Sequence, residues 1–204
     1  MKFSVSPQKG WYRYVLIMAG VLIFGLGVVY MRLIAKSGLA LAACVSGGSD
    51  SVKSMSALCD EQLNVPVDSI LVIKHARQMY VYHQSRLLKV YKIALGNNPV
   101  GPKHFQGDRK TPEGLYYING KNANSMAHKS IGISYPNDDD RSYARSKRLP
   151  TGGDVEIHGF LNSWDNNKAY LNTDWTWGCI AVANDDIDEL FKYVAMGTPI
   201  NIVP

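Results

Sequence analysis

The stretch DWTWGCIAVANDDIDEL, residues 174–190, sets a cysteine beside a glycine, then an apolar run, then an acidic segment. The acidic segment predicts a helix start, because Asn184 can cap it and the aspartates that follow place negative charge at the positive end of the helix dipole. Gly197 and Pro199 predict its end. One apolar stripe has the spacing of a single helix face that packs on the body: Ile187, Leu190, Phe191 and Val194.

Upstream of this helix, the sequence predicts a series of strands. They are short, rich in β-branched and aromatic residues, and bounded by turn-forming residues: 69–74, 78–83, 87–95, 115–119, 130–135 and 154–158, with a closing strand at 199–203. Gly, Pro and Asn are dense in residues 96–114, which predicts a long structured loop. Residues 136–153 read as a charged loop with room for one helical turn. The predicted fold is a mainly β body with one or two packed helices.

An uncharged apolar segment, residues 14–31, is long enough to cross a bilayer core of roughly 30 Å as a helix. A buried core helix is rarely apolar on every face over such a length. Basic residues lie on both sides and slightly favour the N-terminus in the cytoplasm: Lys2, Lys9, Arg13, Arg32 and Lys36. We expect a membrane anchor or signal segment at residues 1–36, a flexible linker at 37–66 and the folded body at 67–204.

A second targeting signal competes with the plain anchor. The motif LALAAC, residues 39–44, is similar to a bacterial lipobox in which Cys44 carries the lipid. Cys44 can instead form a disulfide with Cys59 in an oxidising compartment, which leaves Cys179 as the odd one of three cysteines. In each case we expect the body beyond the inner membrane, in the periplasm.

The charge distribution argues against a nucleic-acid partner. The chain has a net charge of +5, and its residues 1–66 hold six Lys and Arg against three acids. The body is therefore close to neutral and lacks the basic bias that nucleic acid requires. The basic bias of the N-terminal part fits a membrane instead.

Cys179 and His158 are the candidate nucleophile and base. His158 ends the segment VEIH and precedes Gly159, while Cys179 follows Gly178. A cysteine attacks as the thiolate, which a neighbouring histidine can generate by taking its proton. The backbone amides of Trp177, Gly178 and Cys179 are candidates to stabilise the resulting oxyanion. Spacing alone leaves an alternative open, in which Cys179 is a buried small hydrophobe and His158 a structural residue.

Four segments together resemble the L,D-transpeptidase catalytic domain family, YkuD or ErfK/YbiS/YcfS/YnhG. They are ILVIKHARQMYVYHQSRLLKVYKIALG (70–96), GDRKTPEGLYYI (107–118), VEIHGF (155–160) and TWGCIAVANDDIDEL (176–190). The resemblance covers roughly residues 68–204. It implies an L,D-transpeptidase-like β-sandwich or barrel, preceded here by the predicted transmembrane helix, with Cys179 and His158 in a cleft.

The resemblance also implies a substrate, the stem peptide of peptidoglycan. Cys179 would attack the carbonyl of the diamino acid at the third position and expel the terminal D-alanine. An amine of another stem, or a lysine of an outer-membrane lipoprotein, would then resolve the acyl-enzyme. No cofactor is implied.

Two positions depart from the family's pattern. The family often has Ser/Thr-His-Gly-Cys, whereas this chain has Thr176-Trp177-Gly178-Cys179. The backbone amides are kept, and Trp177 is expected to line the cleft. The family often carries an arginine two residues after the cysteine, where this chain has Ala181, so that position offers no contact to a substrate carboxylate. Both departures resemble a sub-branch of YafK-like proteins, some of which cleave the link between lipoprotein and peptidoglycan.

Smaller roles are expected elsewhere. Thr176 and Asp174 are candidates to orient His158 or bind substrate, and Gly159 and Tyr135 are candidates for the substrate groove. A loop near the cleft is expected to be shaped by Asp108, Thr111, Pro112 and Gly114. The other histidines lack metal-ligand spacing and no CxxC motif is present, so no metal is expected.

Three functions follow from these observations. The leading one is a transpeptidase that forms 3–3 crosslinks or attaches a lipoprotein. The second keeps the site and uses water, as an L,D-carboxypeptidase or an amidase that releases lipoprotein; acceptor access decides between the two. The third, a non-catalytic cell-wall-binding module, is disfavoured because His158 and Cys179 are both present with glycines beside them. The expected partners are peptidoglycan stem peptides, an outer-membrane lipoprotein and the inner membrane.

Overall fold

The computed structural model describes residues 62–204. The predicted anchor, most of the linker, Cys44 and Cys59 lie outside this range. Within it, none of the helices has the length and apolarity needed to span a bilayer. The elements in chain order are β1 (Ser69–Ile73), β2 (Gln78–His83), β3 (Arg86–Lys92), β4 (Gly114–Ser125), β5 (His128–Ile133), α3 (Asp138–Lys147), β6 (Glu156–His158), the 3-10 helix η1 (Lys168–Asn172), β7 (Ile180–Ala181), α4 (Asn184–Tyr193) and β8 (Pro199–Val203).

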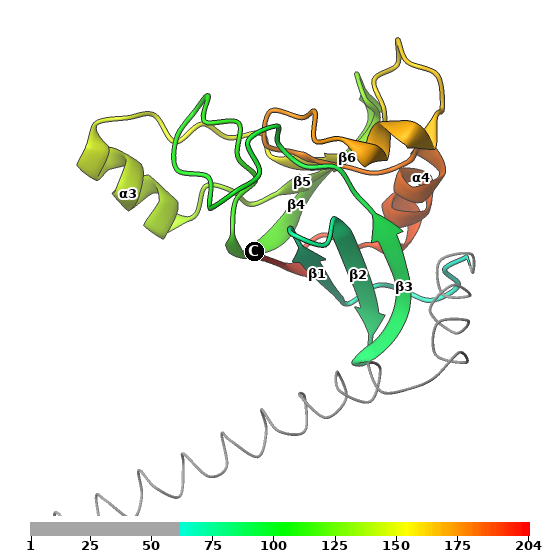
Figure 1. The fold of residues 1–204 in the computed structure, drawn as a ribbon. Coiled ribbons are helices and arrows are strands. Elements are labelled where there is room, and N and C mark those ends of the chain that lie inside the picture. Colours follow the sequence, from blue (N-terminus) through cyan, green and yellow to red (C-terminus); the bar gives the residue numbers. More distant parts are fainter. Residues whose placement is uncertain (1–61) are drawn as a thin grey trace, which may run out of the picture. The chain divides into compact units, whose positions relative to one another are not determined.

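The described strands form one sheet with the order β3-β2-β1-β8-β4-β5-β6-β7 (Figure 1). The β1–β8 and β6–β7 pairs are parallel and the other neighbours are antiparallel. β4 changes partner along its length, since residues 114–117 pair with β8 and residues 118–125 pair with β5. Beyond β3, Ala94 bridges to Ala181 of β7. The two ends of the sheet therefore meet, as they do in a barrel.

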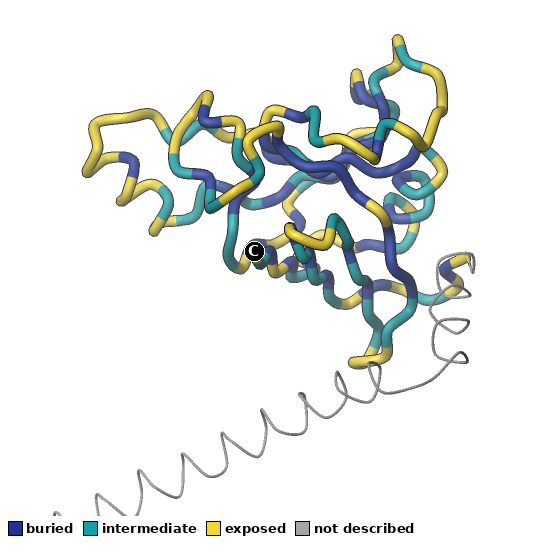
Figure 2. The backbone as a smooth tube through the Cα atoms, viewed as in Figure 1, coloured by how far each residue is buried: buried dark blue, intermediate teal, exposed yellow. Residues whose placement is uncertain are grey.

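The core lies inside this sheet and follows the period of two that strands impose on side chains. Ile70 and Val72 of β1 and Ile200 and Ile202 of β8 are buried, while the residues between them are partly or fully exposed. Figure 2 shows the buried tube continuing through the centre of the body, with exposure concentrated in the loops. Burial of these apolar side chains is the main force that closes the sheet.

Helix α4 confirms the prediction of one amphipathic helix after the cysteine. Ile187 and Leu190 are fully buried, and the helix contacts β5 and β6. The predicted cap is wrong, because Ala183 occupies the N-cap position without a side-chain bond. Asn184 instead accepts a hydrogen bond from the Phe160 amide at 2.8 Å, which ties the helix start to the segment after β6.

Two elements are longer than the sequence predicted. Helix α3 has ten residues where one turn was expected, and a capping box between Asn137 and Asp140 starts it. Only Ala144 of this helix is buried, so the helix carries no apolar stripe that periodicity could detect. It lies at the opposite side of the body from α4 (Figure 1). Strand β4 runs on to Ser125 through a mostly exposed polar stretch.

Candidate active site

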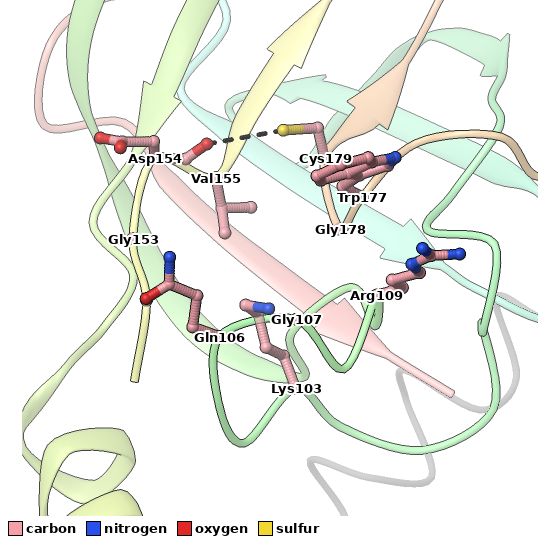
Figure 3. A pocket seen from close by; sticks show the side chains of 11 residues that line it. Lys103, Gln106, Gly107, Arg109, Gly153, Asp154, Val155, Trp177, Gly178 and Cys179 are labelled. Atoms are coloured by element: carbon pink, nitrogen blue, oxygen red, sulfur yellow. Dashed lines mark hydrogen bonds between the residues drawn. The ribbon is translucent and has the colours of Figure 1, made fainter. Parts of the chain in front are cut away.

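Cys179 lies directly before β7, at the wall of a cavity of about 340 Å³. The side chain is half buried, and its Sγ–H donates to the Asp154 carbonyl at 3.5 Å (Figure 3). Three parts of the chain line the cavity: the loop before β4, the segment before β6 and the residues directly before β7. The lining residues are Lys103, Gln106, Gly107, Arg109, Gly152, Gly153, Asp154, Val155, Trp177, Gly178 and Cys179. The thiol can therefore meet a ligand that enters this space.

The register of β6 and β7 brings Cys179 and His158 to the same face of the sheet. The two strands are parallel, with Ile157 opposite Ile180 and His158 opposite Ala181. Since side chains alternate along a strand, Cys179 points to the same side as Ala181 and His158. The two residues are offset by one strand, about 4.8 Å, and by two positions, roughly 6.6 Å. An imidazole and a thiol on such a diagonal can reach each other by side-chain rotation.

The tautomer of His158 follows from its backbone contact. Nδ1 lies 2.7 Å from the Gly159 carbonyl oxygen. A carbonyl only accepts, so Nδ1 carries the hydrogen and Nε2 is left as a proton acceptor. The ring is 7% exposed and meets the edge of Trp175, with ring centroids 5.6 Å apart. His158 is thus a buried, neutral imidazole with Nε2 free to accept a proton, and it does not itself line the cavity.

The pKa shifts of the pair favour the neutral state of both groups. Burial lowers the pKa of His158 below its ordinary value of 6.5, and the hydrogen bond to Gly159 opposes this only in part. Burial raises the pKa of Cys179 to about 11; the Glu156 and Asp154 carboxylates add to the effect, while the Glu156 amide and Lys103 act against it. At neutral pH the site holds a thiol and an imidazole, so the thiol must lose its proton during attack.

Thr176 holds the loop that carries Cys179. Its hydroxyl donates to the Cys179 carbonyl at 2.7 Å and accepts from the Gly178 amide at 3.2 Å. Of the three amides proposed for an oxyanion hole, that of Gly178 therefore has a partner. Within residues 62–204, the amides of Trp177 and Cys179 have no hydrogen-bond acceptor. These two remain available to a substrate oxygen.

The glycine before Cys179 and the glycine after His158 are required because a larger residue would not fit at either position. Gly178 has a φ of +131°, and a Cβ there would lie 2.7 Å from the Lys110 carbonyl. At Gly159 a Cβ would lie 2.6 Å from the Asn184 side-chain oxygen, so this glycine makes room for the contact that fixes α4. Gly159 does not line the cavity. The structure thus gives Gly159 a packing role beside Asn184, and the substrate-groove role stays a prediction.

Two predicted site residues have structural partners instead of His158. Asp174 binds Arg77 at 2.6 Å and accepts from the Leu95 amide at 3.0 Å. Tyr135 is 4% exposed and donates to the Thr151 carbonyl at 3.1 Å. It lines a second cavity of about 300 Å³, not the cavity of Cys179. Asp174 and Tyr135 therefore brace the segments on either side of the site.

The sequence did not reveal the polar residues, two of them charged, that residues 96–114 contribute to the cavity. Lys103, Gln106 and Arg109 all line it, within the loop that was assigned a shaping role only. Asp108 organises this loop, since it accepts from Lys103 at 2.8 Å and from three backbone amides. The basic density of KHFQGDRK, residues 103–110, was the available signal. As expected, Trp177 lines the cavity.

Within residues 62–204, no three histidine, cysteine, aspartate or glutamate side chains are grouped so that they could hold a metal ion. The geometry instead defines a mainly β domain with a cysteine at a polar cavity and a buried neutral histidine on the neighbouring strand. Within that class, the sequence profile described as YkuD, L,D-transpeptidase catalytic domain, matches residues 68–202. The chain belongs to this family of L,D-transpeptidase catalytic domains.

Similar curated proteins support the assignment. The chain is 32% identical over 165 residues to the Escherichia coli K12 protein named "Putative L,D-transpeptidase YafK". The match covers 76% of this chain and 60% of that relative, so the chain spans less than two thirds of the relative's length. The same figures hold for the protein of that name from Escherichia coli O157:H7.

Solved structures share the fold. A single-residue variant of the helical cell shape determining protein Pgp2 from Campylobacter jejuni superposes with a TM-score of 0.51 at 22% identity. The superposition covers 75% of this chain and 53% of that protein. At this level of identity the likeness concerns the fold alone.

Proposed function

We propose that the chain is a peptidoglycan-modifying enzyme that transfers an acyl group through a thioester on Cys179. The observation that carries the proposal is the register of β6 and β7. It sets Cys179 and His158 on one face of the sheet, with the thiol at a cavity of about 340 Å³. Membership in the L,D-transpeptidase family supports a stem peptide as substrate.

In the proposed acylation, the carbonyl of the diamino acid at the third stem position lies over Sγ. The Cys179 thiol turns from the Asp154 carbonyl towards Nε2 of His158, gives up its proton, and forms the bond from sulfur to carbon. The amides of Trp177 and Cys179 receive the negative charge on the substrate oxygen. The tetrahedral carbon expels D-alanine, whose amine takes the proton from His158, and a thioester remains.

In the proposed second half, an acceptor amine attacks the thioester and passes its proton to His158. The new amide forms, and sulfur leaves and regains the proton. A second cavity of about 300 Å³ shares Asp154 and Val155 with the first. The donor and the acceptor can therefore occupy adjoining spaces, which supports transfer to an amine of another stem or of a lipoprotein lysine.

We also propose the location. The uncharged residues 14–31 and the basic residues around them support an inner-membrane anchor with the body in the periplasm, where stem peptides and outer-membrane lipoproteins are found.

The test is mass spectrometry of muropeptides that carry tetrapeptide stems, incubated with the full chain in detergent. A 3–3 crosslinked dimer together with free D-alanine is the expected result. D-Alanine release alone identifies water as the acceptor and makes the chain a hydrolase with the same thioester. A carbapenem adduct on Cys179, measured by intact mass, is expected in the wild type and absent in Cys179→Ala. Binding of stems without any conversion or adduct would establish the wall-binding module instead.

A further inference from the structure

Arg109 is a cation at the Cys179 cavity without a charged partner. In the part of the chain that the structure describes, its guanidinium takes part in no hydrogen bond and no ion pair. Its one ring contact is Trp177, with the guanidinium carbon 5.5 Å from the ring centroid. Figure 3 shows Arg109 next to Trp177 at the cavity. Five guanidinium hydrogens are therefore free at the entrance to the site.

The other cations of this loop are already occupied. Lys103 is 5% exposed, forms an ion pair with Asp108 at 2.8 Å and donates to the Phe105 carbonyl at 3.2 Å. Its positive charge is thus balanced inside the protein. Lys110 points to the Val100 carbonyl and does not line the cavity. Among the residues that line this cavity, the unbalanced positive charge belongs to Arg109.

The backbone of Arg109 is held in an unusual conformation. Its φ is 57°, in the left-handed region that non-glycine residues rarely occupy. Both neighbouring peptides are fixed. The Asp108 carbonyl of the preceding peptide accepts from the Asn98 side-chain amide at 3.2 Å. In the following peptide the Arg109 carbonyl accepts from the Asn98 backbone amide at 3.2 Å and the Lys110 amide donates to Asp108 at 3.1 Å. Such a conformation persists only where the surroundings enforce it, and it is concentrated at ligand sites. The side chain is therefore presented from a rigid base.

The geometry points to a carboxylate as the ligand of Arg109. We propose that Arg109 binds a carboxylate of the stem peptide through the two-pronged contact of its planar guanidinium. This inference rests on the proposed function. The indole of Trp177, which is 77% exposed, holds the guanidinium plane from one side. The Asp154 carboxylate does not compete, because it points away from Cys179 (Figure 3).

Position 181 cannot take this role. Ala181 is fully buried within β7, and its backbone exchanges hydrogen bonds with Ala94 at 2.8 and 2.9 Å. The carboxylate contact that we propose lies instead in the loop before β4, at Arg109. A stem peptide offers two such groups, the terminal carboxylate of the leaving residue and the free carboxylate of the diamino acid. Their chemistry is the same, so amidated analogues must separate them.

The experiment measures binding without turnover, in full-length Cys179→Ala protein, by calorimetry. The ligands are the tetrapeptide stem, its C-terminal amide, and the stem whose diamino acid is amidated. Adding Arg109→Gln is expected to weaken the unmodified stem about tenfold, the loss of a charged hydrogen bond. The penalty is expected to vanish for the one analogue that lacks the recognised carboxylate, which identifies that group. Arg109→Lys keeps the charge without the fork and is expected to lie in between.

Lys110→Gln is the matched control, because it removes the neighbouring charge from outside the cavity; less than a twofold change is expected. Equal penalties from Arg109→Gln on all three ligands, or no penalty on any, overturn the inference. If the wild type turns over the stem and Arg109→Gln has an unchanged KM, the Arg109 inference is overturned and the proposed function stands. If binding depends on Arg109 but no turnover occurs, the Arg109 inference stands and the proposed function is overturned. No binding to any of the ligands counts against both.

Discussion

Two parts of the chain at the Cys179 site, a pair of strands and a loop, are held by different forces. The strand wall (residues 156–158 and 176–181) carries the thiol and the imidazole, and the fully buried Ile157 and Ile180 fix it in the core. The loop wall (residues 96–114) has no strand before Gly114 and depends on buried charges. Lys74 binds Glu113 at 2.7 Å and the Gly101 and Thr111 carbonyls, and Lys103 binds Asp108.

The strand wall and the loop wall therefore differ in which interactions fix their residues in place. Cys179 and His158 lie where many backbone hydrogen bonds and apolar contacts hold the chain, so no single contact determines their position. Lys103 and Arg109 lie in the loop wall, whose position depends on a few buried charged contacts. We expect mutations in the strand wall to change chemistry before stability, and mutations in the loop wall to change stability and recognition before chemistry. The following predictions are arranged by the size of the effect.

Cys179→Ala gives the largest effect and concerns the strand wall. Activity on tetrapeptide stems is expected to fall by about 10⁴-fold or more, because the covalent route is lost. The free energy of unfolding is expected to change by less than about 1 kcal/mol, since only a half-buried sulfur is removed. Muropeptide turnover and urea unfolding of the same preparation measure the two. Residual activity near the wild-type level would remove Cys179 from the mechanism.

Asp108→Ala tests the loop wall. The variant leaves the buried Lys103 ammonium without its partner and is expected to lose about 3–5 kcal/mol of stability. Urea unfolding measures the loss. The control is the double variant Lys103→Met/Asp108→Asn, which removes both charges and keeps a side-chain oxygen for the backbone amides, and it is expected to lose less stability than Asp108→Ala. A single variant as stable as the wild type would show that this ion pair does not hold the loop.

Asp108 also makes the stability of the loop wall depend on pH in the acid range. Burial works against the charged form, but Lys103 and three backbone amides outweigh it and hold the pKa of Asp108 below its ordinary value of 3.8. The folded pKa is therefore lower than the unfolded one. The contribution of Asp108 is complete above pH 3.8 and is lost as the pH falls through the folded pKa. Acid unfolding of the wild type, compared with the double variant, measures this contribution.

The pH dependence of the reaction tests the protonation states of His158 and Cys179 in the strand wall. The pKa of His158 is lowered, so the acid limb of the rate is expected below pH 6.5, the ordinary value for histidine. Iodoacetamide alkylation of Cys179 in His158→Ala is expected to rise only towards pH 11, where the pKa of the buried thiol lies. A thiolate present at pH 7 in that variant, detected by its ultraviolet absorbance, would contradict this description.

Ser130→Ala gives the smallest effect. Ser130 lies opposite His158 in the β5–β6 pair and is 1% exposed, and its hydroxyl has no hydrogen-bond partner in the described structure. Replacing it loses no bond and removes a buried unpaired polar group, so stability is expected to rise by up to about 1 kcal/mol. Thermal unfolding measures the change. A loss of more than 1 kcal/mol would reveal a partner that the hydroxyl finds in solution.

The sequence predicted the elements that have regular apolar patterns. The closing strand at residues 199–203 and the helix after Cys179 are found as expected, because burial of one face imposes a period that can be read. Helix α3 was underestimated because its stability comes from a cap and a charged surface. The extension of β4 was missed because residues 120–125 are polar and pair outside the core.

The candidate site could be read in part for the same reason. Gly178 before Cys179, and the strand and Gly159 around His158, have local signatures, and the structure places His158 at the end of β6 and Cys179 directly before the neighbouring β7. The partners of Asp174 and Tyr135 depend on segments far away in sequence, Arg77 and Thr151, and no local pattern reveals them. The free guanidinium of Arg109 is likewise defined by which neighbouring charges are already balanced, and this is known only once the loop has folded.

The position of β8 has a consequence for how the domain is made. This strand follows all the others along the chain, yet it pairs with β1 on one side and β4 on the other. Until residues 199–203 have been synthesised, β1 and β4 each have an open edge where β8 will pair. Such delayed, long-range closure slows assembly and exposes unpaired edges to other chains. During its biogenesis the domain thus has an interval in which it depends on protection from aggregation.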